Sequence, residues 1–402
     1  MEPQPSYRAL FAIPSMGRVL LGMVLSRTAN SMLGVALLLF TLDRFGSPSL
    51  AGIVAFASAA PSLLVGPLAG ALLVRHGRAR LIILDQLTAA TALVEIASLT
   101  IAGVLAPWVL VLVTALAGLT TPLSGVGLRT LFPLIVPRHL WVRVNAVDSN
   151  GYVLATLVGP PVAGLLVQLI GAPQALFVIA GLYCASAAVI VGVPDPRPAA
   201  AHTEHLLVAA WQGLRYTLAN PALRGLAVAL SIVNVGGGIV SILVPVLLLT
   251  RFGLGEGAVG AVWAVSGLAG GISALIVGRW RIAGRERPMV VWSIAGMAAA
   301  GLAVIASPTL PVIIGFMAVQ GLLNGPLDVA MFTLRQRKTD PAWLGRAFAV
   351  SMSLNFSGYP IGAALGGALV ALGTDAAMGT AIVFGLIATI GAAIMLPRED
   401  AA

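Results

Sequence analysis

Long apolar runs separated by short polar segments dominate the sequence. An α-helix needs about 20 apolar residues to cross a bilayer. Runs of at least about that length occur at 18–41, 49–74, 81–105, 108–133, 144–170, 174–193, 223–249, 257–278, 288–307, 310–334, 347–372 and 376–396. The pattern therefore predicts twelve transmembrane helices. The runs 310–334 and 347–372 are rich in glycine and proline, which allows kinks there.

The second half of the chain repeats the first. Shifted by 203 residues, the segment that starts at Arg346 matches the segment that starts at Arg143. Both segments carry small residues at four-residue spacing: Ala155, Gly159 and Ala163, and Gly358, Gly362 and Gly366. That spacing puts each trio on one helix face, where another backbone can approach closely in lipid. The repeat predicts two six-helix halves, residues 1–193 and 223–402.

Composition and charge agree with a membrane protein. Hydrophobic residues make up 59% of the chain and charged residues 9%, against roughly 25% charged in soluble domains. The net charge of +9 comes from short clusters between apolar runs, with no basic stripe interleaved with aromatics, which argues against nucleic-acid binding. Cys184 is the only cysteine, so neither an intramolecular disulfide nor a cysteine metal cluster is expected.

The arginines predict the orientation. Most of them lie at both chain ends and around the loops after the even-numbered runs, whereas the opposite loops hold only Arg44 and Arg251. Because cytoplasmic loops are enriched in Lys and Arg, we expect a multi-pass protein of the cell (inner or plasma) membrane with both termini in the cytoplasm. The polar connection 194–222 is predicted to be a cytoplasmic linker, and its part 203–218 fits an amphipathic helix on the membrane surface.

Polar side chains inside the apolar runs are candidates for a substrate or proton pathway, because they are costly in lipid and usually face a cavity. The run 310–334 carries Gln320, Asn324 and Asp328 on one helix face. That face suits a cavity or, alternatively, a hydrogen-bonded seam between helices. The other candidates in the half-repeats are Arg27, Asn30, Asn234 and Asn355.

Two carboxyl groups compete as the carrier of a coupled proton. Asp328 is the only acid in its run. Glu95 would lie about 21 Å along the helix that begins at Leu81, at 1.5 Å per residue. Glu95 is either a proton carrier or a protonated packing residue, and Asp328 is our first choice.

Three further charges have alternative roles. Arg27 fits the pathway, or it braces Asp148 or Asp85. Asp85 and Arg129 are expected near the cytoplasmic interface, as gate or snorkelling charges.

Two motifs resemble the major facilitator superfamily. Residues 70–80, GALLVRHGRAR, are similar to the family's loop signature between its second and third helices, and Val74 replaces the aspartate of that signature. The matching residues are Gly70, Arg75, Gly77, Arg78 and Arg80. In the family that acid helps to hold a gate between the halves, so this chain lacks the residue that makes the usual gating contact.

The second motif resembles the helix-5 motif of the family's exporters. In residues 155–164, ATLVGPPVAG, the matching residues are Gly159, Pro160 and Gly164, with Ala155 and Ala163 in place of two glycines. A glycine-rich packing face alone would also produce this pattern. With LRTLFPLIVP at 128–137 and VNAV at 144–147, the whole chain is similar to bacterial efflux members of the enterobactin-exporter and macrolide-efflux type. The resemblance implies the major facilitator fold, an all-α membrane protein of two six-helix halves.

These observations predict a secondary transporter rather than an enzyme. The sequence has no phosphate-binding Gly-x-x-x-x-Gly-Lys loop, no Gly-x-Ser-x-Gly and no His-Glu-x-x-His. We therefore expect no cofactor and no metal. The expected function is proton-coupled efflux of a small amphipathic compound, drug- or siderophore-like, by a monomer that works by alternating access. The alternative is a facilitator or symporter for nutrient uptake; a scaffold without transport would not need the polar face at 320–328.

Overall fold

The computed structural model describes residues 7–195, 206–279, 284–340 and 343–398. Its helices in chain order are α1 (Tyr7–Phe11), α2 (Met16–Phe45), α3 (Pro48–His76), α4 (Arg78–Ile101), α5 (Pro107–Ile135), η1 (Arg138–Leu140), α6 (Trp141–Ile170), α7 (Ala172–Ile190), α8 (Leu206–Ala219), α9 (Pro221–Val246), η2 (Leu247–Arg251), α10 (Glu256–Val277), α11 (Glu286–Ala306), α12 (Leu310–Arg337), α13 (Leu344–Phe356), α14 (Gly358–Val370) and α15 (Thr374–Met395).

The all-α membrane fold is confirmed. Within the described residues, eleven segments are long and apolar enough to cross a bilayer. The predicted run 347–372 is divided between α13 and α14, which meet at Ser357. By contrast, α12 continues as one helix through Pro326, so the possible kink in the run 310–334 does not divide that helix.

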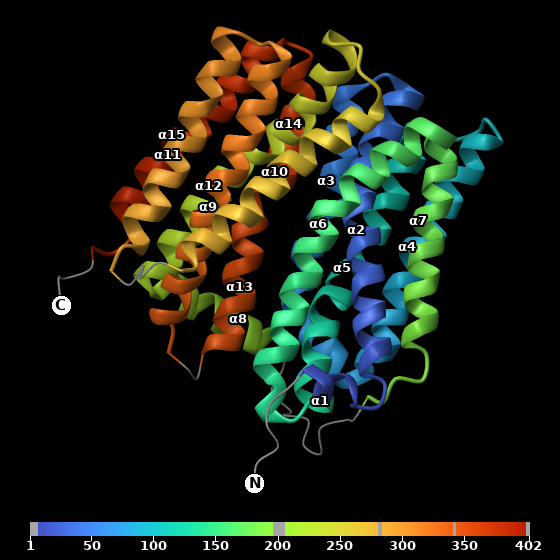
Figure 1. The fold of residues 1–402 in the computed structure, drawn as a ribbon, viewed down its shortest axis with the longest axis vertical. Coiled ribbons are helices and arrows are strands. Elements are labelled where there is room, and N and C mark those ends of the chain that lie inside the picture. The colour runs from blue at the N-terminus through green and yellow to red at the C-terminus, as the bar shows by residue number, and fades with distance from the viewer. Residues whose placement is uncertain (1–6, 196–205, 280–283, 341–342, 399–402) are drawn as a thin grey trace.

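The helices form two bundles, α2–α7 and α9–α15, which lie side by side (Figure 1). The same pairs are in contact in each bundle. In the N-terminal bundle α2 packs on α6 and α7, as α9 packs on α14 and α15 in the C-terminal bundle; α3 packs on α5 as α10 packs on α12. Between the bundles the main contacts are those of α6 with α10 and of α3 with α14.

The glycine faces seen in the sequence pack within the bundles. A Cβ added at Gly159 of α6 would lie 2.7 Å from the side chain of Ser31 in α2. In the C-terminal bundle, a Cβ at Gly366 of α14 would lie 2.8 Å from the Cα of Ile239 in α9. Real Cβ atoms do not approach this closely, so these helices meet backbone to backbone, the small-residue packing that holds helices together in lipid.

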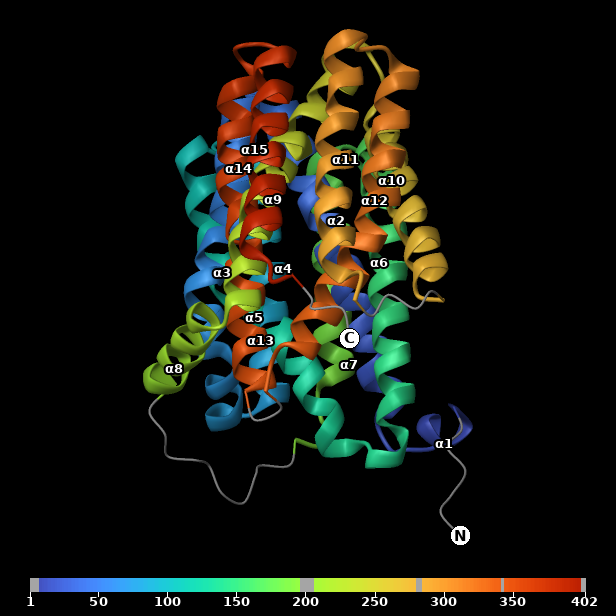
Figure 2. The ribbon, with the colours of Figure 1, turned by 90° about the vertical axis from the view of Figure 1, so that its left-hand side faces the viewer.

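The short helix α8 lies at the same end of the molecule as α1, and we call this end the α8 end (Figure 2). Its Tyr216 ring stacks on Trp343 with the ring centroids 4.8 Å apart, and the Tyr216 hydroxyl accepts a hydrogen bond from the Asp340 amide at 3.0 Å. Other positions of α8 leave Val208 and Trp211 exposed. The predicted amphipathic helix is thus present over 206–219, while 203–205 lie outside the described residues.

At the opposite end, which we call the far end, the two bundles touch closely. A Cβ added at Gly260 of α10 would lie 2.5 Å from the carbonyl oxygen of Pro160 in α6. Toward the α8 end the gap widens, because the nearest atom to such a Cβ lies at 3.8 Å for Gly267 and 3.9 Å for Gly271.

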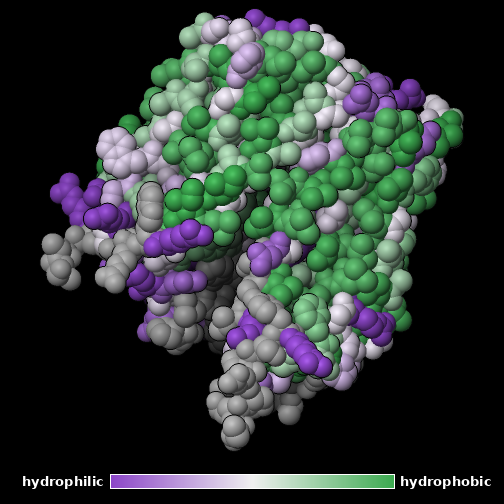
Figure 3. Space-filling view, viewed as in Figure 1, coloured by the Kyte–Doolittle hydropathy of each residue, from purple (hydrophilic) through white to green (hydrophobic). Residues whose placement is uncertain are grey.

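The contact between α3 and α14 is also a close backbone contact at the far end. The Ser49 hydroxyl donates to the carbonyl oxygen of Gly367 at 3.1 Å, and a Cβ at Gly367 would lie 2.6 Å from the carbonyl oxygen of Pro48. Both contacts belong to the far end. The molecule is therefore closed at the far end. Toward the α8 end, α3 still contacts α13, whereas α6 and α10 diverge, and the face drawn in Figure 3 shows a hollow between the bundles.

If the Gly260 contact holds the far end shut, Gly260→Ala will open it, because the added methyl group meets backbone that cannot move aside. About 1 kcal/mol of strain shifts a two-state ratio about fivefold. Spin labels at the repeat-related positions Arg44 and Arg251, in a Cys184→Ser background, will report a longer distance. Gly267→Ala is the matched control, since it has room for a methyl group; identical distance distributions for the three proteins would contradict the prediction.

Candidate functional site

The exposed side chains of α5 distinguish a lipid face from an interior face. Three apolar residues, Leu112, Leu116 and Leu119, are exposed on one side. At 100° per residue, the exposed Thr121 and Gly125 lie roughly opposite these leucines, and the exposed Arg129 lies about 110° from them. An exposed apolar stripe suits lipid, and Arg129 lies off this stripe, on the side where it contacts Asp148 of α6.

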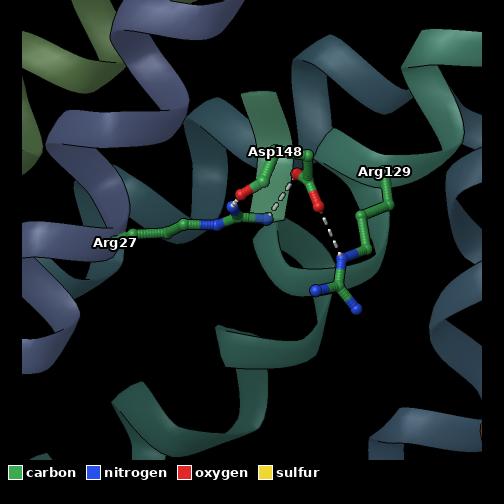
Figure 4. A network of polar contacts seen from close by, with 3 residues as sticks. All are labelled: Arg27, Arg129 and Asp148. Atoms are coloured by element: carbon green, nitrogen blue, oxygen red, sulfur yellow. Dashed lines mark hydrogen bonds and ion pairs between the residues drawn. The ribbon is translucent and has the colours of Figure 1, made fainter. Parts of the chain in front are cut away.

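Arg129 belongs to a cluster of three charges from three helices (Figure 4). The Nη2 atom of Arg27, on α2, lies 2.6 Å from Oδ1 of Asp148 on α6. The Nε atom of Arg129, on α5, lies 3.4 Å from the other carboxylate oxygen. Arg27 also donates from Nη1 to the backbone oxygen of Asp148 at 2.5 Å, and its guanidinium lies 5.7 Å from the centre of the Tyr152 ring.

The geometry shows which carboxylate Arg27 contacts and where Asn30 lies. Arg27 braces Asp148, not Asp85. Asn30 is exposed on the same face of α2 as Arg27, one turn farther along the helix, so the N-terminal wall of the hollow is polar at this level.

The C-terminal bundle contributes a second polar group from α12. The side-chain amide of Asn324 donates to Oδ2 of Asp328 at 3.0 Å, and Asn324 is exposed on the side of α12 away from the exposed Leu322. Two turns farther on, Arg335 is fully buried. Its charge interacts with that of Asp328, its Nη1 lies 2.7 Å from the Met352 sulfur, and its guanidinium lies 5.8 Å from the centre of the Phe332 ring.

Three predicted pathway residues lie instead in seams between helices. Gln320 donates to the carbonyl oxygen of Met297 on α11 at 3.0 Å. Asn234 donates to the carbonyl oxygen of Asn355 at 3.0 Å, and Asn355 itself is buried. For Gln320 the seam alternative therefore holds, and the face predicted at 320–328 divides between two roles.

The surroundings of Glu95 and Asp85 differ from those that their suggested roles require. Glu95 is exposed on the face of α4 that also exposes Leu84, Leu87 and Val94, which is the outer surface of the bundle. Asp85 is buried within the N-terminal bundle. It therefore neither snorkels to water nor lies at a gate between the bundles.

The loop motif between α3 and α4 is organised by a carboxylate from elsewhere. Gly77 has φ +94°, a left-handed conformation that suits glycine. Asp195, just after α7, accepts from the Ala79 amide at 3.1 Å and lies 3.8 Å from Nη1 of Arg78. Arg75 is exposed. The surroundings of Gly70 and Val74 lie outside the described residues.

The helix-5 motif contributes to packing within the N-terminal bundle and to packing between the two bundles. Gly159 faces α2 within its own bundle, whereas Pro160 and Gly164 meet the other bundle at the far end. A Cβ at Gly164 would lie 2.5 Å from the carbonyl oxygen of Glu256 in α10.

Sequence reasoning missed three residues that the structure places in these contacts: Tyr152, Asp195 and Arg335. Asp195 follows a span directly in the segment Pro194-Asp195-Pro196, a signal for a turn with a capping carboxylate. Arg335 directly follows the apolar run 310–334, and burial at the end of such a run leaves no mark in the sequence.

Comparison with known proteins identifies the family. The sequence profile described as Major Facilitator Superfamily matches residues 19–281 and 226–402. The chain belongs to this superfamily. It is also 36% identical, over 99% of both chains, to y4rN of Sinorhizobium fredii, named an uncharacterized MFS-type transporter. The resemblance inferred from the motifs is confirmed, and the chain is related to transporters, not enzymes.

Two further relatives are named for export. The multidrug efflux pump Tap of Mycolicibacterium fortuitum is 28% identical over 88% of this chain and 89% of its own. The enterobactin exporter EntS of Escherichia coli is 27% identical over 69% of this chain and 66% of its own. Among solved structures, a variant of the nucleoside transporter NupG has a TM-score of 0.74 at 12% identity, over 95% of this chain and 100% of its own; this likeness shows the fold.

The cluster around Asp148 makes a testable contribution to stability. Asp148→Asn will leave the half-buried Arg27 without its anion, at a cost of about 3 kcal/mol, measured by unfolding the purified protein in detergent. Adding Arg27→Met will cost less than the sum of the single changes, because the two side chains interact. Asp43→Asn, exposed at the far end, is the control and should change the free energy of unfolding by less than about 0.5 kcal/mol. Additive effects of the Arg27 and Asp148 changes would refute the coupling.

Proposed function

We propose that the protein exports a small amphipathic compound in exchange for protons, as a monomer that works by alternating access. The observation that carries this proposal is the arrangement of the two bundles, which touch at the far end and diverge around polar side chains toward the α8 end. A transporter of this kind presents its midplane site to one side of the membrane at a time, by rocking one bundle against the other.

The proposal assigns the α8 end to the cytoplasm. The clusters of basic residues in the loops at this end supply the positive-inside bias, whereas Arg44 and Arg251 belong to the far end. With this orientation, both chain ends are cytoplasmic and the hollow in Figure 3 opens to the cytoplasm. An exporter in this state is ready to receive its substrate.

Export is favoured over uptake by the relatives Tap and EntS, which are named as an efflux pump and an exporter. The alternative, nutrient uptake on the same fold, draws on the likeness to NupG, a nucleoside transporter, which at 12% identity concerns the fold alone.

We assign proton coupling to Asp328. It lies on the interior side of α12, hydrogen-bonded to the exposed Asn324, and its charge interacts with that of the buried Arg335. Protonation of Asp328 removes the negative charge near this cation, which changes the electrostatic energy of α12 at the place where the bundles separate. A carboxyl that exchanges protons with each side in turn is what antiport requires.

The orientation predicts how single cysteines react in a Cys184→Ser background. A cysteine at Pro107, exposed at the far end, will react with an impermeant maleimide added to intact cells. A cysteine at His76, exposed at the α8 end, will react only after the membrane is opened. Labelling of position 76 in sealed cells would overturn the assignment.

For the coupling residue, Asp328→Asn keeps the shape of the side chain but cannot release a proton. We expect it to abolish export driven by a pH gradient in reconstituted vesicles, assayed with a compound that the wild-type protein removes from cells, while membrane insertion is unchanged. Glu95→Gln is the matched control and should transport at the wild-type rate, because Glu95 lies on the outer surface of α4. Wild-type transport by Asp328→Asn would exclude Asp328 as the carrier, and movement of the compound with the proton would establish uptake.

A further inference from the structure

We infer that the cluster of Arg27, Asp148 and Arg129 binds the negatively charged group of the transported compound, and that the substrate is therefore an amphipathic aromatic acid. This inference rests on the proposed transport function and goes beyond it, because it names the chemical class of the substrate and the group that recognises it.

The charges of this cluster do not balance. Two guanidinium groups meet at one carboxylate, and among the described residues Asp148 is the one acid within ion-pair distance of either of them. The cluster thus carries one excess positive charge, and its two arginines belong to segments long and apolar enough to span a membrane, Met16–Phe45 and Pro107–Phe132. Such a charge is costly there unless an anion or water compensates it, and a ligand anion that enters from the open hollow would do so.

The guanidinium of Arg129 is exposed and only loosely paired with Asp148. Its side chain is 58% exposed, against 13% for Arg27. Its contact with Asp148 uses Nε at 3.4 Å, longer than an ordinary N–H···O hydrogen bond of about 2.7–3.2 Å. In Figure 4 its two terminal nitrogens point away from Asp148. A planar guanidinium whose terminal nitrogens have no hydrogen-bond or ion-pair partner among the described residues matches a carboxylate, which it can bind through two parallel hydrogen bonds.

The surroundings of the cluster suit an aromatic ligand body. Tyr152, whose ring borders Arg27, is 52% exposed, so an aromatic surface lies beside the cluster and can stack on a flat ring. A Cβ added at Gly125, one turn from Arg129 on the same face of α5, would meet nothing within 4 Å, which leaves open space next to the guanidinium. A flat apolar body attached to an acidic group fits these surroundings.

The alternatives are that Arg129 only extends its charge to water, or that it forms an ion pair with an acid of the other bundle when the α8 end closes. In either case the protein would bind an aromatic acid no better than the corresponding neutral amide. The two ligands have nearly the same shape, and their comparison isolates the contribution of the charge.

The experiment measures binding of naphthoate and naphthamide to the purified full-length protein by calorimetry. We expect the wild type to bind naphthoate at least about tenfold more tightly than naphthamide, because a charge-assisted hydrogen bond contributes a free energy of that size. Arg129→Gln should lose this difference while its affinity for the amide is unchanged, and Arg129→Lys, which keeps the charge without the fork, should retain part of it. Arg44→Gln, at the exposed far end, is the matched control and should bind as the wild type does.

The inference is overturned if the wild type does not favour the acid, or if Arg129→Gln still favours it as strongly as the wild type. Unchanged affinity for the amide shows that the variant is folded. The transport assay that compares Asp328→Asn with the wild type reports separately on the proposed function. Active export together with equal binding of the two ligands would therefore contradict only the substrate class.

Discussion

Helix backbones from the two bundles touch at the far end because glycines leave room for them. In lipid, apolar side chains gain little by meeting one another, so close packing and hydrogen bonds must hold helices together. Gly260 against Pro160 on one side of the molecule, and Gly367 against Pro48 on the other, supply such contacts. They combine close packing with neutral hydrogen bonds, such as that of the Ser49 hydroxyl to the carbonyl oxygen of Gly367, and contacts of this kind suit the proposed rocking of the bundles, which would break and re-form them. The polar interior faces are open at the α8 end because these contacts lie at the far end.

The repeat gives the two bundles the same packing but different chemistry. At the sequence shifts of 207 and 203, Asn234 corresponds to Arg27 and Asn355 to Tyr152. The cation and aromatic ring of the N-terminal bundle are thus replaced by a neutral amide contact, Asn234 to the carbonyl oxygen of Asn355, in the C-terminal bundle. The acid that we assign to proton exchange, Asp328, lies in the C-terminal bundle. Substrate recognition and proton binding are therefore assigned to opposite walls of one hollow.

Hydropathy predicted the helices, and the motifs at 70–80 and 155–164 pointed to the family, because these features are local in the sequence. The direction of individual polar side chains was harder to predict. Glu95 lies on the outer surface, and Gln320 lies in a seam with α11. Periodicity shows which residues share a helix face, but it does not show which neighbouring helix that face meets. The pairing of Arg27 with Asp148 remained one of two alternatives, since the residues are 121 positions apart. Asp195 reaches the α4 start across 116 positions.

Alternating access requires the far-end contact to open in every transport cycle. Gln168 of α6 accepts a hydrogen bond from the Gly257 amide of α10 across this contact at 3.0 Å. The pair Gln168→Cys and Gly257→Cys, in a Cys184→Ser background, can be joined by a short bifunctional thiol reagent that is cleaved by reductant. The account predicts that joining the two cysteines stops transport in vesicles and that reduction restores it, while each single cysteine is unaffected by the reagent. Full transport by protein that is completely cross-linked would contradict it.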